Sequence, residues 1–310
     1  MEMELRPMPR EISLTGCPCV GKGKNGAVYR LDRDTIVKLF RMDEETAWKS
    51  AEQEKHNAQT AYDLGVPTAR SFDVVRCDGH PGIVFELLEA KSLRELVAAE
   101  PERLEALVTK SAELLRTIHR IKVPKGAFPA IADTYRRRAE NLDGWLTTEE
   151  TEALCRVIAS IPERCAYVHG DFHRGNLMVR GEDLLLIDMA DSSTGHPFYD
   201  VLGFYTLCMD IVRMVPPAAV KRIIGWDVAE VQREWDVFSR CYFRGRSDDE
   251  RREVDAMLAF YAQMRQLVFL KIVPVLTDEM RRQIVADARE RFFPMVSGCI
   301  ERFAPLMEGM

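Results

Sequence analysis

The stretch HGDFHRGNLMVRGEDLLLID, residues 169–188, decides the fold. It places Asp171 in a loop, Asn176 five residues later, and Asp188 at the end of a predicted β-hairpin. A phosphoryl-transfer site uses one carboxylate to orient the attacking hydroxyl, and an amide and a second carboxylate to hold Mg²⁺ on the nucleotide phosphates. Any one of these residues could instead cap a turn. Because all three occur at these spacings, the stretch predicts Asp171 as the catalytic base and Asn176 and Asp188 as magnesium ligands.

Two cationic side chains follow Asp171 closely and are candidates for contact with the transferred phosphate. His173 lies two residues after Asp171, where protein kinases carry a lysine that meets the γ-phosphate. A protonated His173 could take that role, and Arg174 is the alternative. Asp200 lies near the start of a later predicted helix, and we expect it to accept hydrogen bonds from the backbone of the catalytic loop.

A second motif, G-x-G-x-x-G, lies near the amino terminus in the segment GKGKNGAVY. Its glycines are Gly21, Gly23 and Gly26. Dinucleotide-binding folds and kinases share this motif, but a dinucleotide fingerprint opens a helix, whereas the strand-like residues 27–31 and 35–40 follow here. Strand, glycine loop and strand is the order found in kinases. We therefore expect the loop backbone to approach nucleotide phosphates and Val28 to lie against the base, although the stretch alone could be an ordinary hairpin turn.

Lys38 interrupts the apolar strand 35–40, where a solvated lysine at a sheet edge is the common explanation. The functional interpretation is that Lys38 reaches the α- and β-phosphates and is held by a glutamate of the next helix, predicted over residues 44–64. Glu52 and Glu54 compete for that role, and they point about 200° apart on a helix. Glu54 shares a face with small alanines that let the helix lie close to the sheet, so Glu54 is the predicted partner.

Further strand-like stretches occupy residues 69–88, and a helical pattern begins after them. An adenine needs only backbone N–H and C=O partners on such a strand, so Glu86 and Leu88 are candidates for contact with the base. We place a hinge at about residues 86–90. The predicted domains are a nucleotide-binding lobe, 1–88, and a catalytic and substrate-binding lobe, 89–310.

The composition is that of a folded globular protein, with 310 residues, 46% apolar and 30% charged, and a net charge of −6. The acidic balance argues against general nucleic-acid binding, because nucleic-acid-binding proteins usually carry a basic surplus. The amino terminus lacks the pattern of a secretory signal, and the longest apolar run, 267–276, is interrupted by Lys271 and too short to span a bilayer. We therefore expect a cytoplasmic protein without nucleic-acid or membrane partners, whose eight cysteines are reduced core thiols.

These residues together resemble the aminoglycoside phosphotransferase and choline kinase family, whose fold is similar to that of protein kinases. The resemblance covers nearly the whole chain, and the H-G-D-x-x-x-x-N followed by I-D is specific. It implies an α+β, bilobal fold with a small N-lobe, made of an antiparallel sheet plus a helix, and a larger, mainly helical C-lobe. Arg174 stands where many members have proline, and Met189-Ala190 replaces the common Trp-Glu, so we assign no drug-modifying subgroup.

The expected activity is transfer of the γ-phosphate of ATP or GTP, with Mg²⁺, to a hydroxyl of an aminoglycoside-like compound, a sugar or an amino alcohol. Only 12 positions separate Asp188 from Asp200, too few for the peptide-docking segment of a protein kinase. A Ser/Thr protein kinase and a non-catalytic nucleotide-binding regulator are the alternatives on this fold. As in the family it resembles, helices between residues 200 and 310 are expected to form the acceptor pocket. Candidate carboxylates there are Asp210, Glu234 and Asp236, although helix-surface charges are the commoner explanation.

Overall fold

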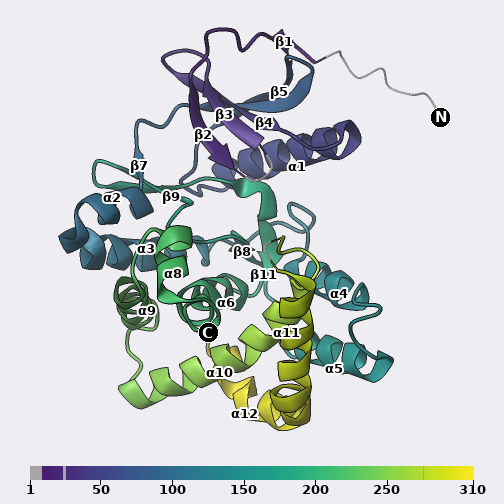
Figure 1. The fold of residues 1–310 in the computed structure, drawn as a ribbon. Helices are drawn as coiled ribbons and strands as arrows, with labels where there is room; N and C mark the ends of the chain where they lie inside the picture. Colours follow the sequence, from purple (N-terminus) through teal and green to yellow (C-terminus); the bar gives the residue numbers. More distant parts are fainter. Residues whose placement is uncertain (1–8, 24–25, 275) are drawn as a thin grey trace. The chain divides into compact units, whose positions relative to one another are not determined.

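The computed structural model describes residues 9–23, 26–274 and 276–310, which form two compact units (Figure 1). The first unit runs to Ser92 and also includes Asn176–Ser192, and the second contains Leu93–Gly175 and Ser193–Met310. The predicted single boundary between residues 88 and 89 does not include this return of the chain to the first unit. Residues 176–192 belong to the first unit because β9 (Leu177–Arg180) pairs with β7 (Lys91–Ser92) in a short sheet.

The described part of the first unit is built on a six-stranded sheet in the order β1-β5-β6-β4-β3-β2. Its strands are β1 (Glu11–Ile12), β2 (Cys19–Gly23), β3 (Gly26–Arg30), β4 (Thr35–Phe40), β5 (Ser71–Cys77) and β6 (His80–Glu86). Each neighbouring pair is antiparallel except β1 and β5, which are parallel. Alternating apolar side chains, including Val37 and Leu39, point to one face and form a buried core. The expectation of a small, mainly antiparallel sheet is confirmed.

Helix α1 (Glu44–Asp63) packs on this sheet, against β5 and β6 in particular. It begins where the side chain of Asp43 accepts a hydrogen bond from the N–H of Thr46 at 3.0 Å. It ends before Gly65, whose φ of 84° suits a glycine after a helix. The face toward the sheet carries fully buried alanines, which allow close approach, and these are Ala47, Ala51, Ala58 and Ala61. The predicted helix over residues 44–64 is confirmed.

A hairpin of β9 and β10 (Asp183–Leu186) completes the first unit. Its turn contains Gly181, whose φ of 60° a glycine adopts without strain. A single turn of 3₁₀ helix, η2 (Met189–Asp191), follows the hairpin. The side-chain amide of Asn57 on α1 donates to the carbonyl oxygens of Met189 and Ala190, at 3.2 and 2.9 Å. The predicted hairpin is therefore confirmed, and α1 fixes the turn that follows it.

The second unit is mainly helical. Its main elements are α2 (Leu93–Ala99), α3 (Leu104–Ile118), α4 (Ile131–Glu140), α5 (Thr148–Ala159), β8 (Ala166–Val168), β11 (Ser193–Gly195), α6 (Phe198–Tyr205), α7 (Ile211–Met214), α8 (Pro217–Ile224), α9 (Val228–Tyr242), α10 (Asp248–Val268), α11 (Asp278–Arg291) and α12 (Val296–Glu308). Helix α10 contacts α4, α5, α6, α11 and α12 (Figure 1). The core between these helices is rich in aromatic rings. One turn of π-helix, η3 (Thr206–Asp210), continues α6. No helix in the described ranges is long and apolar enough to cross a lipid bilayer.

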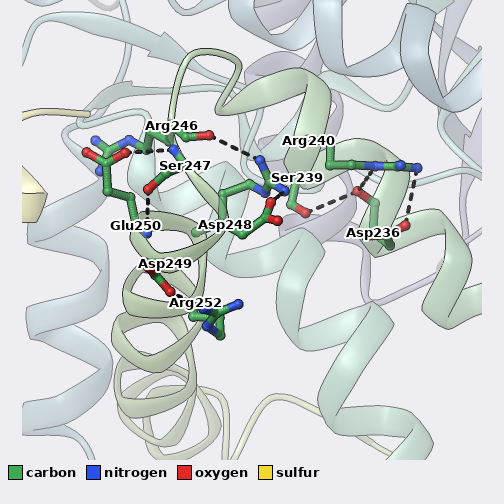
Figure 2. A network of polar contacts seen from close by, with 10 residues as sticks. Asp236, Ser239, Arg240, Arg246, Ser247, Asp248, Asp249, Glu250 and Arg252 are labelled. Carbon is green, nitrogen blue, oxygen red and sulfur yellow. Dashed lines mark hydrogen bonds and ion pairs between the residues drawn. The ribbon is translucent and has the colours of Figure 1, made fainter.

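Figure 2 shows the polar contacts around the end of α9 and the start of α10. Ser247 caps α10 because its hydroxyl accepts from the N–H of Glu250, whose carboxylate accepts from the N–H of Ser247 at 2.7 Å. On α9, Asp236 pairs with Arg240 one turn later, at 3.2 Å. Both side chains of that pair are exposed, so Asp236 is the helix-surface charge that its sequence context indicates.

All eight cysteines are free thiols in the structure. Burial raises the pKa of Cys77, in the core of the first sheet, to about 11. Cys19 and Cys165 are exposed, so the expectation of core thiols is wrong for these two.

Candidate active site

Lys38 is the centre of an ionic cluster inside the first unit. It lies on β4 directly opposite Val28 of β3. Its Nζ atom is 2.7 and 2.8 Å from the two carboxylate oxygens of Glu54, and 3.0 Å from Oδ1 of Asp188. Glu54 is buried, whereas Glu52 is exposed. The structure therefore brings together three residues that the sequence singled out, and it selects Glu54 as the partner of Lys38.

Burial and charge act against each other in this cluster. Burial raises the pKa of Glu54 to about 7, even though the ammonium group of Lys38 opposes that rise. Burial would lower the pKa of Lys38, but the carboxylates of Glu54 and Asp188 outweigh it and raise that pKa above its ordinary value. Lys38 therefore carries a full positive charge at neutral pH, in a place where Glu54 and Asp188 fix its position.

Asn176 and Asp188 flank the β9–β10 hairpin. The N–H of Ile187 donates to the carbonyl oxygen of Asn176 at 3.0 Å, so the residues before β9 and after β10 are adjacent. Asp188 has φ 62° and ψ 68°, a left-handed conformation that costs a residue other than glycine about 1–2 kcal/mol. Such strain is concentrated at functional sites.

The donor set of Asn176 and Asp188 fits Mg²⁺, because an amide oxygen and a carboxylate are the hard oxygen ligands that this ion prefers. The described residues contain no cluster of three or more His, Cys, Asp or Glu side chains placed to hold a metal ion. A magnesium ion bound with a nucleotide needs only one or two protein ligands, because phosphate and water oxygens supply the rest. These two residues could therefore complete such a site.

The glycine motif spans strands β2 and β3, where Gly23 pairs with Gly26. A methyl group on Gly26 would lie 1.7 Å from the carbonyl oxygen of Leu39, so only glycine lets β3 and β4 approach at this point. On Gly21 the same group would meet Val28 at an ordinary 3.5 Å. The intervening Lys24 and Asn25 lie outside the described residues.

The strand end at Glu86 and Leu88 has one backbone donor to offer. The N–H groups of Glu86 and Leu87 donate to the carbonyl oxygens of Arg70 and Asp34, at 2.9 and 2.8 Å. The N–H of Leu88 makes no hydrogen bond to another residue in the described part of the chain. Of the two residues predicted to contact the base, Leu88 therefore has the backbone donor that a ligand can use.

In the second unit, Asp200 holds the backbone of the loop that contains Asp171. Its buried carboxylate accepts hydrogen bonds from the N–H groups of His169 and Gly170, both at 2.8 Å. His119 lies 3.0 Å from the same carboxylate through Nε2, and its Nδ1 is 2.7 Å from the hydroxyl of Tyr242. The predicted contact between Asp200 and the loop backbone is confirmed, and His119, at the end of α3, is a buried residue hydrogen-bonded on both ring nitrogens.

Asp171 follows this anchored turn, and its neighbour is His173. The N–H of Gly175 donates to Nδ1 of His173 at 3.0 Å, so Nε2 carries the proton that faces Asp171, 3.5 Å away. Burial alone would raise the pKa of Asp171, but the hydrogen bond from His173, the electrostatic effect of the His173 and His169 rings, and the charge of Arg265 lower it to about 2. Asp171 is therefore ionised at neutral pH, as an acceptor of a hydroxyl proton must be.

Arg174 points into the second unit and forms a buried ion pair with Glu234 of α9. Nε of Arg174 is 2.9 Å from Oε1 of Glu234, and its Nη2 contacts Oε2. Nη2 is also 3.3 Å from the thiol of Cys208, and the guanidinium lies 4.9 Å from the ring centre of Trp226. The alternative that Arg174 meets the γ-phosphate is therefore wrong, and so is a surface role for Glu234. One indication of this buried pair was present in the sequence, which was that position 174 carries arginine where many members of the resembled family have proline.

Asp210, the remaining candidate carboxylate, is also buried. It accepts a hydrogen bond from the side-chain amide of Gln266 at 3.1 Å, and Arg213 lies 3.9 Å away. Burial raises its pKa, while these contacts oppose the rise. Asp210 is thus not the helix-surface charge that its position suggested.

One family model matches this chain, and several solved structures share its fold. The model of a family described as the phosphotransferase enzyme family matches residues 20–231. A similar solved structure is the aminoglycoside phosphotransferase APH(2'')-Ib with ADP, at 15% identity and a TM-score of 0.57, covering 90% of this chain and 94% of that one. A choline/ethanolamine kinase family protein from Mesorhizobium loti has 16% identity and a TM-score of 0.55, covering 95% and 92%. The complex of APH(2'')-IIa with streptomycin and ATP has 16% identity and a TM-score of 0.55, covering 90% and 93%. No curated protein sequence matches the chain.

Proposed function

Because the chain belongs to the phosphotransferase enzyme family, we propose that it transfers the γ-phosphate of ATP or GTP to a hydroxyl group of a small molecule. The observation that carries this proposal is the contact of Lys38 with both Glu54 and Asp188. Kinases bind nucleotide phosphates with a similar arrangement. In it, a glutamate fixes the position of a lysine, and a second carboxylate lies beside that lysine. Asp171, ionised and held by an anchored loop, supplies the group that the acceptor needs.

In this proposal the first unit binds the nucleotide. The backbone around Gly21, Gly23 and Gly26 surrounds the phosphates, and Val28 lies against the base. Leu88 gives the base a hydrogen bond from its backbone N–H. Lys38 contacts the α- and β-phosphates. Asn176 and Asp188 would hold Mg²⁺, which when bound neutralises charge on the phosphates.

The acceptor is oriented by Asp171. Its carboxylate accepts the hydrogen bond of the acceptor hydroxyl and takes that proton, while the hydroxyl oxygen bonds to the γ-phosphorus and the bond from that phosphorus to the β-phosphate oxygen breaks. The Nε2–H of His173 donates to an oxygen of the transferred group. Positioning and charge stabilisation supply most of the rate enhancement in this chemistry.

The test is release of ADP or GDP across a panel of hydroxyl compounds, with Asp171→Asn beside wild type. We expect Asp171→Asn to lower the acceptor-stimulated rate by about 10²–10⁴-fold, with nucleotide binding unchanged. Asp183→Asn, an exposed carboxylate at the hairpin turn, is the matched control. Equal rates for Asp171→Asn and wild type with every acceptor would contradict the proposal.

The same measurements separate the two alternatives. A non-catalytic nucleotide-binding regulator would give equal nucleotide-induced shifts in melting temperature with magnesium and with a chelator. A Ser/Thr protein kinase would label a protein and no small molecule. We favour the small-molecule acceptor because only 12 positions separate Asp188 from Asp200.

A further inference from the structure

Arg265, on helix α10 of the second unit, is a half-buried cation without a carboxylate partner. Its guanidinium lies 4.2 Å from the ring centre of Phe269, and its Nε atom is buried without a hydrogen-bond partner. No carboxylate of the described residues lies within ion-pair distance of it, and its side chain donates a hydrogen bond to the hydroxyl of Tyr135. Partial burial of an unpaired charge is unfavourable, so such a group is usually paired with an anion.

The surroundings of Arg265 are cationic. The guanidinium of Arg138, on α4, lies 4.5 Å from the centre of the same Phe269 ring, so two guanidinium groups share one aromatic side chain. The neighbouring carboxylate, Asp210, is held by Gln266 at 3.1 Å and by Arg213 at 3.9 Å. Asp210 forms no ion pair with Arg265, although the charge of Arg265 is one of those that oppose the rise in the pKa of Asp210.

Arg265 lies near the catalytic loop within the second unit. A methyl group on Gly203 of α6 would be 3.6 Å from Nη2 of Arg265, so the guanidinium lies over this helix. Gly203 comes one turn after Asp200, whose carboxylate binds the N–H groups just before Asp171. The charge of Arg265 also contributes to the low pKa of Asp171.

We propose that Arg265 binds an anionic group of the acceptor, a carboxylate or a phosphate, so that the acceptor is a hydroxy acid or a phosphorylated alcohol. This inference rests on the proposed kinase function and narrows its substrate class. Guanidinium groups bind carboxylate and phosphate through two parallel hydrogen bonds. The charge of Arg265 also repels a cation, so this site disfavours aminoglycosides and quaternary amines as acceptors.

The experiment compares acceptors that share a primary hydroxyl but differ in charge. Glycerate and glycerol 3-phosphate carry the two anions, glycerol is neutral, and choline and an aminoglycoside are cationic. We expect turnover to be fastest with one of the two anionic compounds, and the comparison between them identifies the anion. Arg265→Gln should then lower kcat/KM for that compound by about 10–100-fold, mainly through KM. Arg265→Lys should recover part of the loss.

Arg302→Gln is the matched control. Arg302 also lies over a phenylalanine ring, Phe303 at 5.0 Å, but it is exposed and already paired with Glu253 at 2.8 Å. It should behave as wild type. A preference for a cationic or neutral acceptor, or equal kcat/KM for Arg265→Gln and wild type, would overturn the inference while leaving the kinase function intact.

A binding measurement decides the inference if no compound in the panel is phosphorylated. Inorganic phosphate, added with saturating ADP, should raise the melting temperature of wild type and of Arg302→Gln, but not of Arg265→Gln. No shift in wild type, or an equal shift in Arg265→Gln, would overturn the assignment. The turnover of Asp171→Asn tests the kinase function separately.

Discussion

The buried pair of Arg174 and Glu234 allows a direct test of how the catalytic loop is held. Both side chains are within a few per cent of full burial. Removing one partner leaves the other charged and buried, which costs about 3–5 kcal/mol in comparable pairs. Arg174→Met and Glu234→Leu should each lower the free energy of unfolding by that amount. In a unit of this size, the melting temperature should fall by roughly 2–4 °C per kcal/mol.

The double variant Arg174→Met with Glu234→Leu should behave differently. It removes both charges at once and fills the space with apolar groups, a change that is often neutral or stabilising by about 1–4 kcal/mol. Cys208 stays in place, with its thiol 3.3 Å from Oε2 of Glu234 in the wild type. The double variant should therefore be close to wild type in stability, so the coupling energy between the two positions should be several kcal/mol.

Urea denaturation of the four proteins measures this coupling, and kinetics give a second readout. The backbone carbonyl of Arg174 also accepts from the N–H of Arg94 at 3.1 Å, a contact that survives the substitutions. We expect the double variant to fold stably but to lose kcat, because the loop three residues after Asp171 loses its fixed anchor. Additive destabilisation by the two single changes would refute the reasoning, because it would mean that the charges do not depend on each other.

Three further predictions concern the first unit. Asp188→Gly should be more stable than Asp188→Ala by about 1–2 kcal/mol in urea, because glycine relieves the left-handed backbone; both variants should lose activity, and equal stability would contradict the strain. Gly26→Ala should cost at least about 1–3 kcal/mol and weaken nucleotide binding, because its methyl group meets the Leu39 carbonyl. Gly21→Ala should change the free energy of unfolding little, and similar losses of stability for both variants would refute this. Burial raises the pKa of Glu54 from 4.5 to about 7, so the folded protein binds a proton at Glu54 more tightly than the unfolded chain does. The stability that this proton contributes is complete below about pH 4.5 and is lost as the pH rises through 7. The stability difference between wild type and Glu54→Gln should fall by at most about 3 kcal/mol across that range, and a difference that grows with pH would contradict the sign.

Spacing and local pattern were enough to predict which side chains meet at Lys38. Lys38 and Glu54 lie on a strand and the helix that follows it, so helical periodicity decided which glutamate faces the lysine. The position of Asp188 beside Asn176 was predictable because a hairpin places the end of its second strand next to the start of its first strand. These are short-range relationships, which a sequence expresses directly.

The contacts that cross long stretches of chain were not predictable in the same way. Glu234 lies 60 positions from Arg174, and no local pattern separates a buried helix carboxylate from an exposed one. The role of Arg265 depends on Phe269 and on a helix more than 60 residues earlier in the chain. The sequence therefore predicted the contacts of Lys38 but not the contacts between residues far apart in the chain.

The return of Asn176–Ser192 to the first unit also has a consequence for biosynthesis. At typical translation rates, the ribosome adds these residues roughly 4–20 s after residue 92. Until then the nascent chain holds Lys38 without Asp188, and β7 without the strand that it pairs with. A fragment that stops at Ser92 should consequently remain incompletely folded. Fusions or shuffled genes that transplant the nucleotide-binding part will need residues from both sides of Gly175 to be functional.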